Sequence, residues 1–255
     1  MVSGLKQTIK TCIGKVGLLP LFYPRIRLAG KYLSGSGVEI GALAAPLKLP
    51  RNASAKYIDI ATREESIRKF PELNPNDIVK VDYISNGFTL AGVPSSQFDF
   101  LIANHVLEHS PDPIGTLVQW HRVLKPRGML FVALPTLEDC FDCGRQLTPY
   151  QHMLDDYEIA CKGRFSELVE RNKSHYREWL AVSEPAILKR PALPPDQAEK
   201  RIQEMADKQE EIHFHTFNME SVKEVFSRLS TTILPGLGIM EIVADRNEII
   251  IIAKK

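Results

Sequence analysis

The sequence lacks the features that mark several common classes of protein. No apolar run approaches the roughly 18 residues that a membrane-spanning helix needs. The 255 residues include four cysteines, too few for a disulfide framework in a chain of this size, so a reducing cytoplasm is the expected setting. The formal net charge is +1, which excludes a global field that would steer the chain toward nucleic acid.

A metal site is not predicted either. Cys140 and Cys143 have the spacing C-x-x-C, but a second pair with metal-binding spacing is missing. His213 and His215 flank Phe214, and the alternation of an extended chain directs both histidines toward one face. A metal held by such a pair needs a third ligand, and the sequence identifies none.

Basic residues gather in the N-terminal segment, residues 1–36. Six lysines and arginines precede the first acidic residue, Glu39. Four apolar residues recur at helical spacing and predict an amphipathic helix: Leu5, Ile9, Ile13 and Val16. One interpretation is docking of residues 1–34 on an anionic membrane. We prefer the alternative, a helix that packs on the domain with its basic face in solvent.

What is present is an alternation of strands and helices. Five apolar runs are predicted strands, over residues 37–41, 56–60, 77–82, 98–103 and 129–134. A capping box that starts at Thr62 predicts one helix, and apolar residues at helical spacing predict another over 113–124. This order is typical of a parallel sheet with helices on both faces.

The rest of the chain completes the predicted architecture. Asn218 can cap a further helix, and two β-rich runs over 239–254 predict a hairpin. The fold class is therefore α/β: a Rossmann-like, mostly parallel seven-stranded sheet with an antiparallel C-terminal hairpin and a helical insertion. We assign 37–135 and 218–255 to the core, and 136–217 to the insertion, which we expect to form a substrate lid.

Acidic residues accompany the first three predicted strands. Glu39, Asp59 and Asp82 stand at or just before the carboxyl ends of these strands. Such ends lie side by side in an open α/β sheet, and ligands bind there. A carboxylate after the second strand can accept both hydroxyls of a ribose, and one after the third can accept from an adenine amino group. The alternative for each acid is a solvated strand end.

At these residues the chain resembles the class I S-adenosylmethionine-dependent methyltransferases. Three segments look like motifs of that family: Glu39–Ala42, Tyr57–Ile60 and Val81–Tyr83. Two more, Asn104–His109 and Arg122–Gly128, are close to those of its type 11 subgroup. The resemblance implies S-adenosyl-L-methionine as the cofactor, bound by Glu39, Gly41, Ala42, Asp59, Ile60, Asp82, Tyr83, Asn104, His105 and His109. The chain departs from the family in lacking a full G-x-G-x-x-G, so we expect little help from a helix dipole in holding the cofactor.

A narrower resemblance concerns the acceptor. Five segments are similar to a bacterial subset often met in cell-surface polysaccharide gene clusters: Gly41–Leu47, Asp112–Thr116, Arg145–Thr148, His152–Tyr157 and Ile212–His215. This similarity implies a saccharide or another small-molecule acceptor and a role in polysaccharide biosynthesis. Arg145 and Asp156 are the candidates for hydrogen bonds to sugar hydroxyls. The alternative for such charged residues is a solvated helix face.

Transfer to a hydroxyl also requires a group that takes its proton. The sulfonium methyl is already electrophilic, so the protein mainly aligns donor and acceptor. A neutral histidine, with a pKa of about 6.5, suits the role of proton acceptor. The candidates are His152, His213 and His215, with Asp142 as the carboxylate alternative.

Two other functions share these features. An NAD-dependent oxidoreductase also uses an acid after the second strand, but the missing glycine fingerprint and the predicted hairpin argue against it. A non-catalytic module binds the cofactor without turning over any acceptor.

Overall fold

The computed structural model describes residues 23–255. The amphipathic helix predicted within residues 5–16 lies outside the described residues. Of the basic segment, α2 (Pro24–Tyr32) is described, and its charges form ion pairs: Arg25 with Glu248, and Lys31 with Glu241. In residues 23–255, no helix combines the length and the apolar character needed to cross a membrane.

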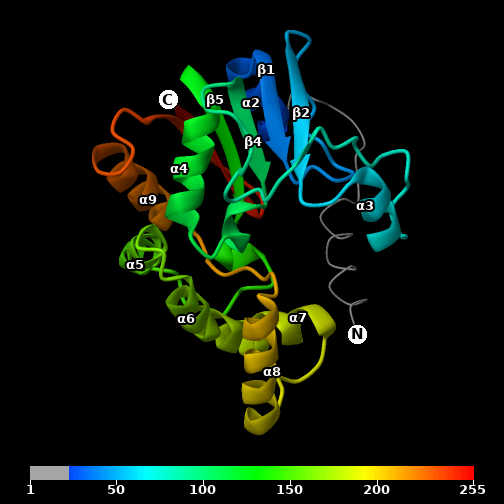
Figure 1. Cartoon of the computed structure of the whole chain (residues 1–255), viewed down its shortest axis with the longest axis vertical. Coiled ribbons are helices and arrows are strands. Elements are labelled where there is room, and N and C mark those ends of the chain that lie inside the picture. The colour runs from blue at the N-terminus through cyan, green and yellow to red at the C-terminus, as the bar shows by residue number, and fades with distance from the viewer. Residues whose placement is uncertain (1–22) are drawn as a thin grey trace.

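Residues 35–254 form a seven-stranded sheet in the order β3-β2-β1-β4-β5-β7-β6 (Figure 1). The first five strands are parallel, and β7 runs antiparallel to both β5 and β6. The predicted sheet with its C-terminal hairpin is therefore confirmed. The strands are β1 (Gly35–Ile40), β2 (Ala53–Asp59), β3 (Tyr83–Ile84), β4 (Phe98–Asn104), β5 (Leu124–Pro135), β6 (Gly238–Asp245) and β7 (Glu248–Lys254).

The strand predicted over residues 77–82 is wrong, because β3 begins only at Tyr83. Side chains form hydrogen bonds with backbone groups that a longer strand would use for its own pairing. The Asp82 carboxylate accepts from the Tyr57 amide at 2.9 Å, and the Arg63 guanidinium donates to the Ile78 carbonyl at 2.8 Å. With these backbone groups engaged, residues 77–82 form a turn and irregular chain instead of a strand.

Three helices start at residues whose side chains cap them. The capping boxes of α3 (Arg63–Lys69) and α9 (Met219–Thr231) are formed by Thr62 and Asn218, as the sequence predicts. The helix expected over 113–124 is α4 (Pro113–Val123), whose first turn is capped by Asp112.

Helices cover both faces of the sheet, because successive side chains of the buried strands point to opposite sides. On one face, α4 and α9 pack through Trp120 and Phe226 against residues such as Leu101. On the other face, α2 packs through Leu28 against Phe100. Each fully buried side chain of this size contributes roughly 1.5–3 kcal/mol of hydrophobic stabilisation.

Residues 150–208 form the helices α5 (Tyr150–Cys161), α6 (Phe165–Glu178), α7 (Glu184–Leu188) and α8 (Pro195–Lys208), with a π-helical turn at Trp179–Ser183. They lie at the end of the molecule toward which the arrows of the parallel strands point (Figure 1). Part of this region has a small core with Tyr176, Trp179 and Ile202, which Phe214 of the following segment completes.

An extended segment, residues 210–218, leads from α8 back to α9 and connects these helices to the sheet. The Phe214 amide donates to the Glu108 carbonyl at 2.8 Å, and the Leu137 amide donates to the Phe217 carbonyl at 2.8 Å. Glu108 follows β4 and Leu137 follows β5. The segment therefore passes along the carboxyl ends of these two strands.

Candidate active site

Three neighbouring strands bring Gly41, Asp59 and Asn104 to one level. The pairing of Ile40 with both Ile58 and Ala103 aligns the three residues that follow them. Gly41 has a φ of +66°, a left-handed conformation that glycine adopts without strain. This level is the carboxyl edge of the parallel sheet, where ligands bind in folds of this type.

Glu39 does not point freely into this edge. Its buried carboxylate accepts from the Leu47 amide at 3.0 Å and from the Asn104 side chain at 3.3 Å. Burial raises the pKa of Glu39 to about 7, against the opposing effect of these hydrogen bonds. Glu39 thus holds the loop that begins at Gly41 and contains the buried residue Ala42.

Asp59 has fewer contacts. Among residues 23–255 it accepts from the Ala61 amide, at 3.3 Å, and partial burial raises its pKa above the usual value. The next residue, Ile60, is 58% exposed. The Ser85 amide donates to the Asp59 carbonyl at 2.9 Å, so the turn after β3 lies beside this strand end. Asp59 is thus half-buried with most of its hydrogen-bonding capacity unused among residues 23–255.

Asp82 and Tyr83 lie further back than predicted. Ile84, not Asp82, pairs with Asp59, whereas Asp82 is level with Tyr57 in the middle of β2. Tyr83 packs its ring edge-on against Phe98, with ring centroids 6.1 Å apart. The reason is the shortened β3, which begins at Tyr83. The register therefore puts Glu39 and Asp82 both level with Tyr57, and Asp82 lies two residues back from Asp59.

The polar residues after β4 form a second group. Asn104 Oδ1 is buried without a hydrogen-bond partner among the described residues. His105 has a φ of +55°, and its Nε2 lies 2.9 Å from Glu248 Oε2. Burial and the neighbouring His213 lower the pKa of His109 well below its usual value. The ring of His109 stands edge-on to that of His213, at 4.6 Å between centroids.

Asp142 and His213 form a buried carboxylate–imidazole pair, with Nδ1 of His213 2.6 Å from Oδ2 of Asp142. Asp142 also accepts from Arg145 at 3.0 Å and from Ser183 at 2.6 Å. Burial favours a higher pKa for Asp142, but the hydrogen bond and charge of His213 and the charge of Arg145 outweigh it and lower the pKa to about 2. Asp142 is therefore ionised at neutral pH.

The sequence interpretation missed Glu108, which faces this pair. Glu108 is completely buried, and neither carboxylate oxygen has a hydrogen-bond partner among the described residues. Its Oε1 lies 3.9 Å from His213 Nε2 and 3.6 Å from His105 Nδ1. Burial raises its pKa. The signal available in the sequence was the position of Glu108 between Leu107 and His109, directly after β4.

The remaining predicted residues lie in a neighbouring cluster. His152 lies near Asp156 and His175, with its Nε2 3.2 Å from Asp156 Oδ2 and 2.9 Å from His175 Nε2. The ring of His215 stands 4.9 Å from that of His175. His213 and His215 therefore contact different groups, although the sequence predicted that they face the same way.

Arg145 and Asp156 are buried, which contradicts the alternative of a solvated helix face. The Arg145 guanidinium donates to the carbonyls of His213 at 2.7 Å and Phe214 at 3.0 Å. Asp156 accepts from Arg171 at 2.7 Å. Arg145 thus positions the segment that carries His213. Sugar binding by Arg145 and Asp156 stays a prediction.

A surface hollow lies at the opposite edge of the sheet. It is lined by Gly35, Asp99 and Lys125, which stand at the amino ends of β1, β4 and β5. It is therefore remote from the strand ends that hold the polar groups described above.

The fold is Rossmann-like, and comparison with known families indicates which class it resembles. Residues 34–132 match the family described as "Methyltransferase domain". The matched part runs from the start of β1 into β5 and includes Glu39, Asp59 and Asn104. Residues 34–132, less than half of the chain, are thus similar to a methyltransferase domain, which agrees with the class I resemblance of the sequence.

Curated relatives match over part of their length. Ubiquinone biosynthesis O-methyltransferases of Azotobacter vinelandii and Pseudomonas aeruginosa are 31% identical over 107 and 110 residues. These alignments cover 42% and 43% of this chain, and 45% and 46% of the two relatives. The chain therefore spans about half the length of the curated relatives it matches.

Solved structures are similar to this chain at low sequence identity. A Rhodobacter sphaeroides protein, provisionally described as a zinc-dependent alcohol dehydrogenase, is 13% identical with a TM-score of 0.52, and covers 100% of this chain and 99% of its own. A SAM-dependent methyltransferase from Aquifex aeolicus is 13% identical with a TM-score of 0.44, and covers 98% of this chain and 97% of its own.

Proposed function

We propose that this protein transfers the methyl group of S-adenosylmethionine to an acceptor hydroxyl, and that His213 takes the hydroxyl proton. The observation that carries the proposal is the Asp142–His213 hydrogen bond of 2.6 Å, located on the segment that crosses the end of β4. The names of the curated relatives, O-methyltransferases, agree with oxygen as the accepting atom.

The carboxyl edge of the sheet fits the cofactor. Asp59 offers a carboxylate with one internal hydrogen bond for the ribose hydroxyls. Asn104 offers a buried oxygen that lacks a partner among the described residues. Gly41 allows a close approach of the backbone. When bound, the cofactor supplies an electrophilic methyl group.

His213 suits the role of the base because its tautomer is determined. Asp142 is ionised, so Nδ1 carries the proton that it accepts, and the lone pair lies on Nε2. Nε2 has no hydrogen-bond partner within 3.5 Å among residues 23–255. The carboxylate that faces it, Glu108, has its Oε1 3.9 Å away. Asp142 can then stabilise the imidazolium that forms when Nε2 accepts the proton.

The acceptor that we propose is a saccharide hydroxyl. The support is the similarity of five segments to the polysaccharide-cluster subset, of which three lie after residue 135, beyond the matched methyltransferase family segment. We further propose that the helical part of residues 136–217 covers the bound acceptor as a lid, because it stands at the carboxyl end of the parallel strands (Figure 1).

A binding measurement tests the cofactor. Isothermal titration of the full chain with S-adenosylmethionine and with NAD should show binding of the first alone. Binding of NAD alone would instead indicate the oxidoreductase alternative and end the methyltransferase proposal.

A transfer measurement tests the reaction. Labelled S-adenosylmethionine is incubated with the chain and a panel of nucleotide sugars, oligosaccharides and quinone precursors. We expect label in a saccharide and much slower labelling with His213→Gln. Label in a quinone precursor contradicts the saccharide acceptor, and cofactor binding without transfer to any member of the panel supports the non-catalytic module.

A further inference from the structure

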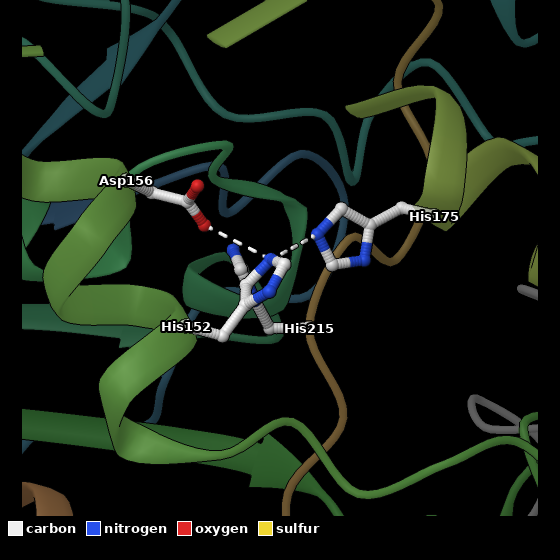
Figure 2. Close-up of side chains that lie close together, drawn as sticks. All are labelled: His152, Asp156, His175 and His215. Atoms are coloured by element: carbon white, nitrogen blue, oxygen red, sulfur yellow. Dashed lines mark hydrogen bonds and ion pairs between the residues drawn. The ribbon is translucent and has the colours of Figure 1, made fainter. Parts of the chain in front are cut away.

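Four side chains from three separate segments converge beside the proposed active site (Figure 2). His152 and Asp156 stand one turn apart on α5, His175 comes from α6, and His215 comes from the extended segment before α9. One nitrogen or oxygen of each lies within 4.8 Å of the corresponding atoms of the others. Three of the four residues are buried, and His152 is partly exposed.

Hydrogen bonds within the protein do not satisfy this cluster. His152 Nε2 lies 2.9 Å from His175 Nε2 and 3.2 Å from Asp156 Oδ2, and one nitrogen has at most one proton for these two acceptors. Both ring nitrogens of His215 are buried without a well-formed hydrogen bond among the described residues, although the Pro111 backbone lies nearby. A buried polar group left unpaired is costly, so such an accumulation calls for a missing partner.

We propose that His152, Asp156, His175 and His215 bind one divalent cation of the zinc class. Three imidazole nitrogens and one carboxylate oxygen match the donors that zinc prefers. Bonds of about 2.0–2.1 Å in a tetrahedral site place the donor atoms roughly 3.3 Å apart. Two of the six separations, 2.9 and 3.2 Å, are close to this value, and all six are at most 4.8 Å.

The surroundings suit a metal ligand set in two further respects. Arg171 donates to the other carboxylate oxygen of Asp156, Oδ1, at 2.7 Å and leaves Oδ2 directed at His152, as in Figure 2. Burial lowers the pKa of His175 to about 3 and that of His215 well below its usual value. Both rings are therefore neutral at pH 7, which is the form that binds metals.

Such an ion joins α5, α6 and residues 210–218 at a single point. His215 is two residues from His213, so the same ion also helps to position the proposed base. The metal site itself does not depend on the proposed methyl transfer, because it requires only the four side chains.

The first test uses the full chain after treatment with a chelator. Titration with Zn²⁺ should show one ion per chain, and Co²⁺ in its place should give the intense visible absorption of tetrahedral coordination. Zinc at 100 times its Kd should raise Tm by roughly 5–10 °C. No binding at micromolar concentrations, or a six-coordinate cobalt spectrum, would overturn the proposal in favour of a cluster of hydrogen-bonded histidines.

Three matched variants locate the ion. We expect His175→Gln to weaken zinc binding by more than about 100-fold, since even outer-sphere partners are worth 10–100-fold. His121→Gln removes a histidine outside the cluster and should leave binding unchanged. His213→Gln tests the neighbouring group of Glu108, His109 and His213, whose donor atoms also lie within 4.8 Å. Loss of binding in His213→Gln with retention in His175→Gln contradicts the proposal.

A further measurement needs no variant, in case His175→Gln fails to fold. X-ray absorption of the zinc-loaded wild-type chain should fit three imidazoles and one oxygen at about 2.0–2.1 Å. Fewer than three imidazoles, or a sulfur ligand from a cysteine, overturns the assignment of the four residues.

Discussion

Two buried carboxylates in two regions of the molecule have opposite electrostatic surroundings. Glu39 lies at the end of β1, in the part that matches the methyltransferase family, and burial raises its pKa to about 7. Asp142 lies beyond the matched segment, and the hydrogen bond and charge of His213 and the charge of Arg145 lower its pKa to about 2 despite burial. The first acid holds a loop, and the second holds a histidine.

The difference extends to the residues around each carboxylate. At the ends of β1 and β2, acidic side chains accept from backbone amides such as those of Leu47 and Ala61. In residues 137–217, buried titratable side chains contact one another instead. Backbone-anchored acids shape a binding edge, whereas paired ionisable groups can move protons. The comparison thus agrees with the proposed roles, cofactor binding in the first region and proton transfer in the second.

The largest expected effect comes from His213→Gln, which tests whether the two regions have separate roles. Removing the base should lower the rate of methyl transfer by about 10²–10⁴-fold. The dissociation constant for S-adenosylmethionine, measured by titration calorimetry, should stay unchanged. An equal loss of cofactor affinity would show that the two regions do not divide the function in this way.

A pH series with Glu39→Gln sharpens the contrast between the two acids. The pKa of Glu39 is 4.5 when unfolded and about 7 when folded. Its contribution to stability is therefore complete below pH 4.5 and is lost as pH rises through 7. Glutamine does not titrate, so the stability of Glu39→Gln relative to wild type should increase by on the order of 2–3 kcal/mol between pH 4.5 and 8. Urea unfolding measures this difference, and a value independent of pH contradicts the raised pKa.

Asp59→Ala tests the binding edge itself. Loss of a charge-assisted hydrogen-bonding pair should weaken S-adenosylmethionine binding at least about tenfold, with transfer at saturating cofactor preserved. Asp82→Ala is the matched control, because that carboxylate accepts from the Tyr57 amide in the middle of β2. We expect a smaller loss of affinity there. An unchanged dissociation constant in folded Asp59→Ala rules out the ribose assignment.

The smallest expected effect concerns a helix cap that takes part in neither cofactor binding nor proton transfer. Asn218→Ala removes the side chain that accepts from the Ser221 amide at 2.9 Å at the start of α9. The free energy of unfolding should fall by about 1 kcal/mol, with cofactor affinity unchanged. Asn218→Gly, which costs only a few tenths of a kcal/mol at such positions, provides the comparison. Equal stability of wild type and Asn218→Ala would show that the cap contributes nothing.

Much of the fold could be predicted because local patterns carry it. The Thr62 and Asn218 capping boxes act within four residues, and the hairpin over 239–254 follows from two β-rich runs around a polar turn. The prediction of a strand over 77–82 was wrong because the hydrogen bonds of these residues depend on groups outside the segment. The Arg63 guanidinium donates a hydrogen bond to the Ile78 carbonyl, and such a contact leaves no local signal in the sequence.

The candidate site divides in the same way. Motif and register place Gly41, Asp59 and Asn104 at one edge, so these residues could be found from the sequence. His175 could not, because it joins His152 and His215 only through the packing of α6 against α5 and the extended segment. Glu108 was overlooked because the sequence does not show that its carboxylate is buried beside His213.

The sequence by itself determined the alternation of strands and helices, the helix caps and the order of the methyltransferase motifs, since each depends on residues close together in the chain. Only the tertiary structure decided which distant ionisable side chains meet: Asp142 with His213, and the His152–Asp156 pair of α5 with His175 and His215. The physical reason is that desolvation and charge pairing depend on distances across the fold, and segments up to 71 residues apart create them here.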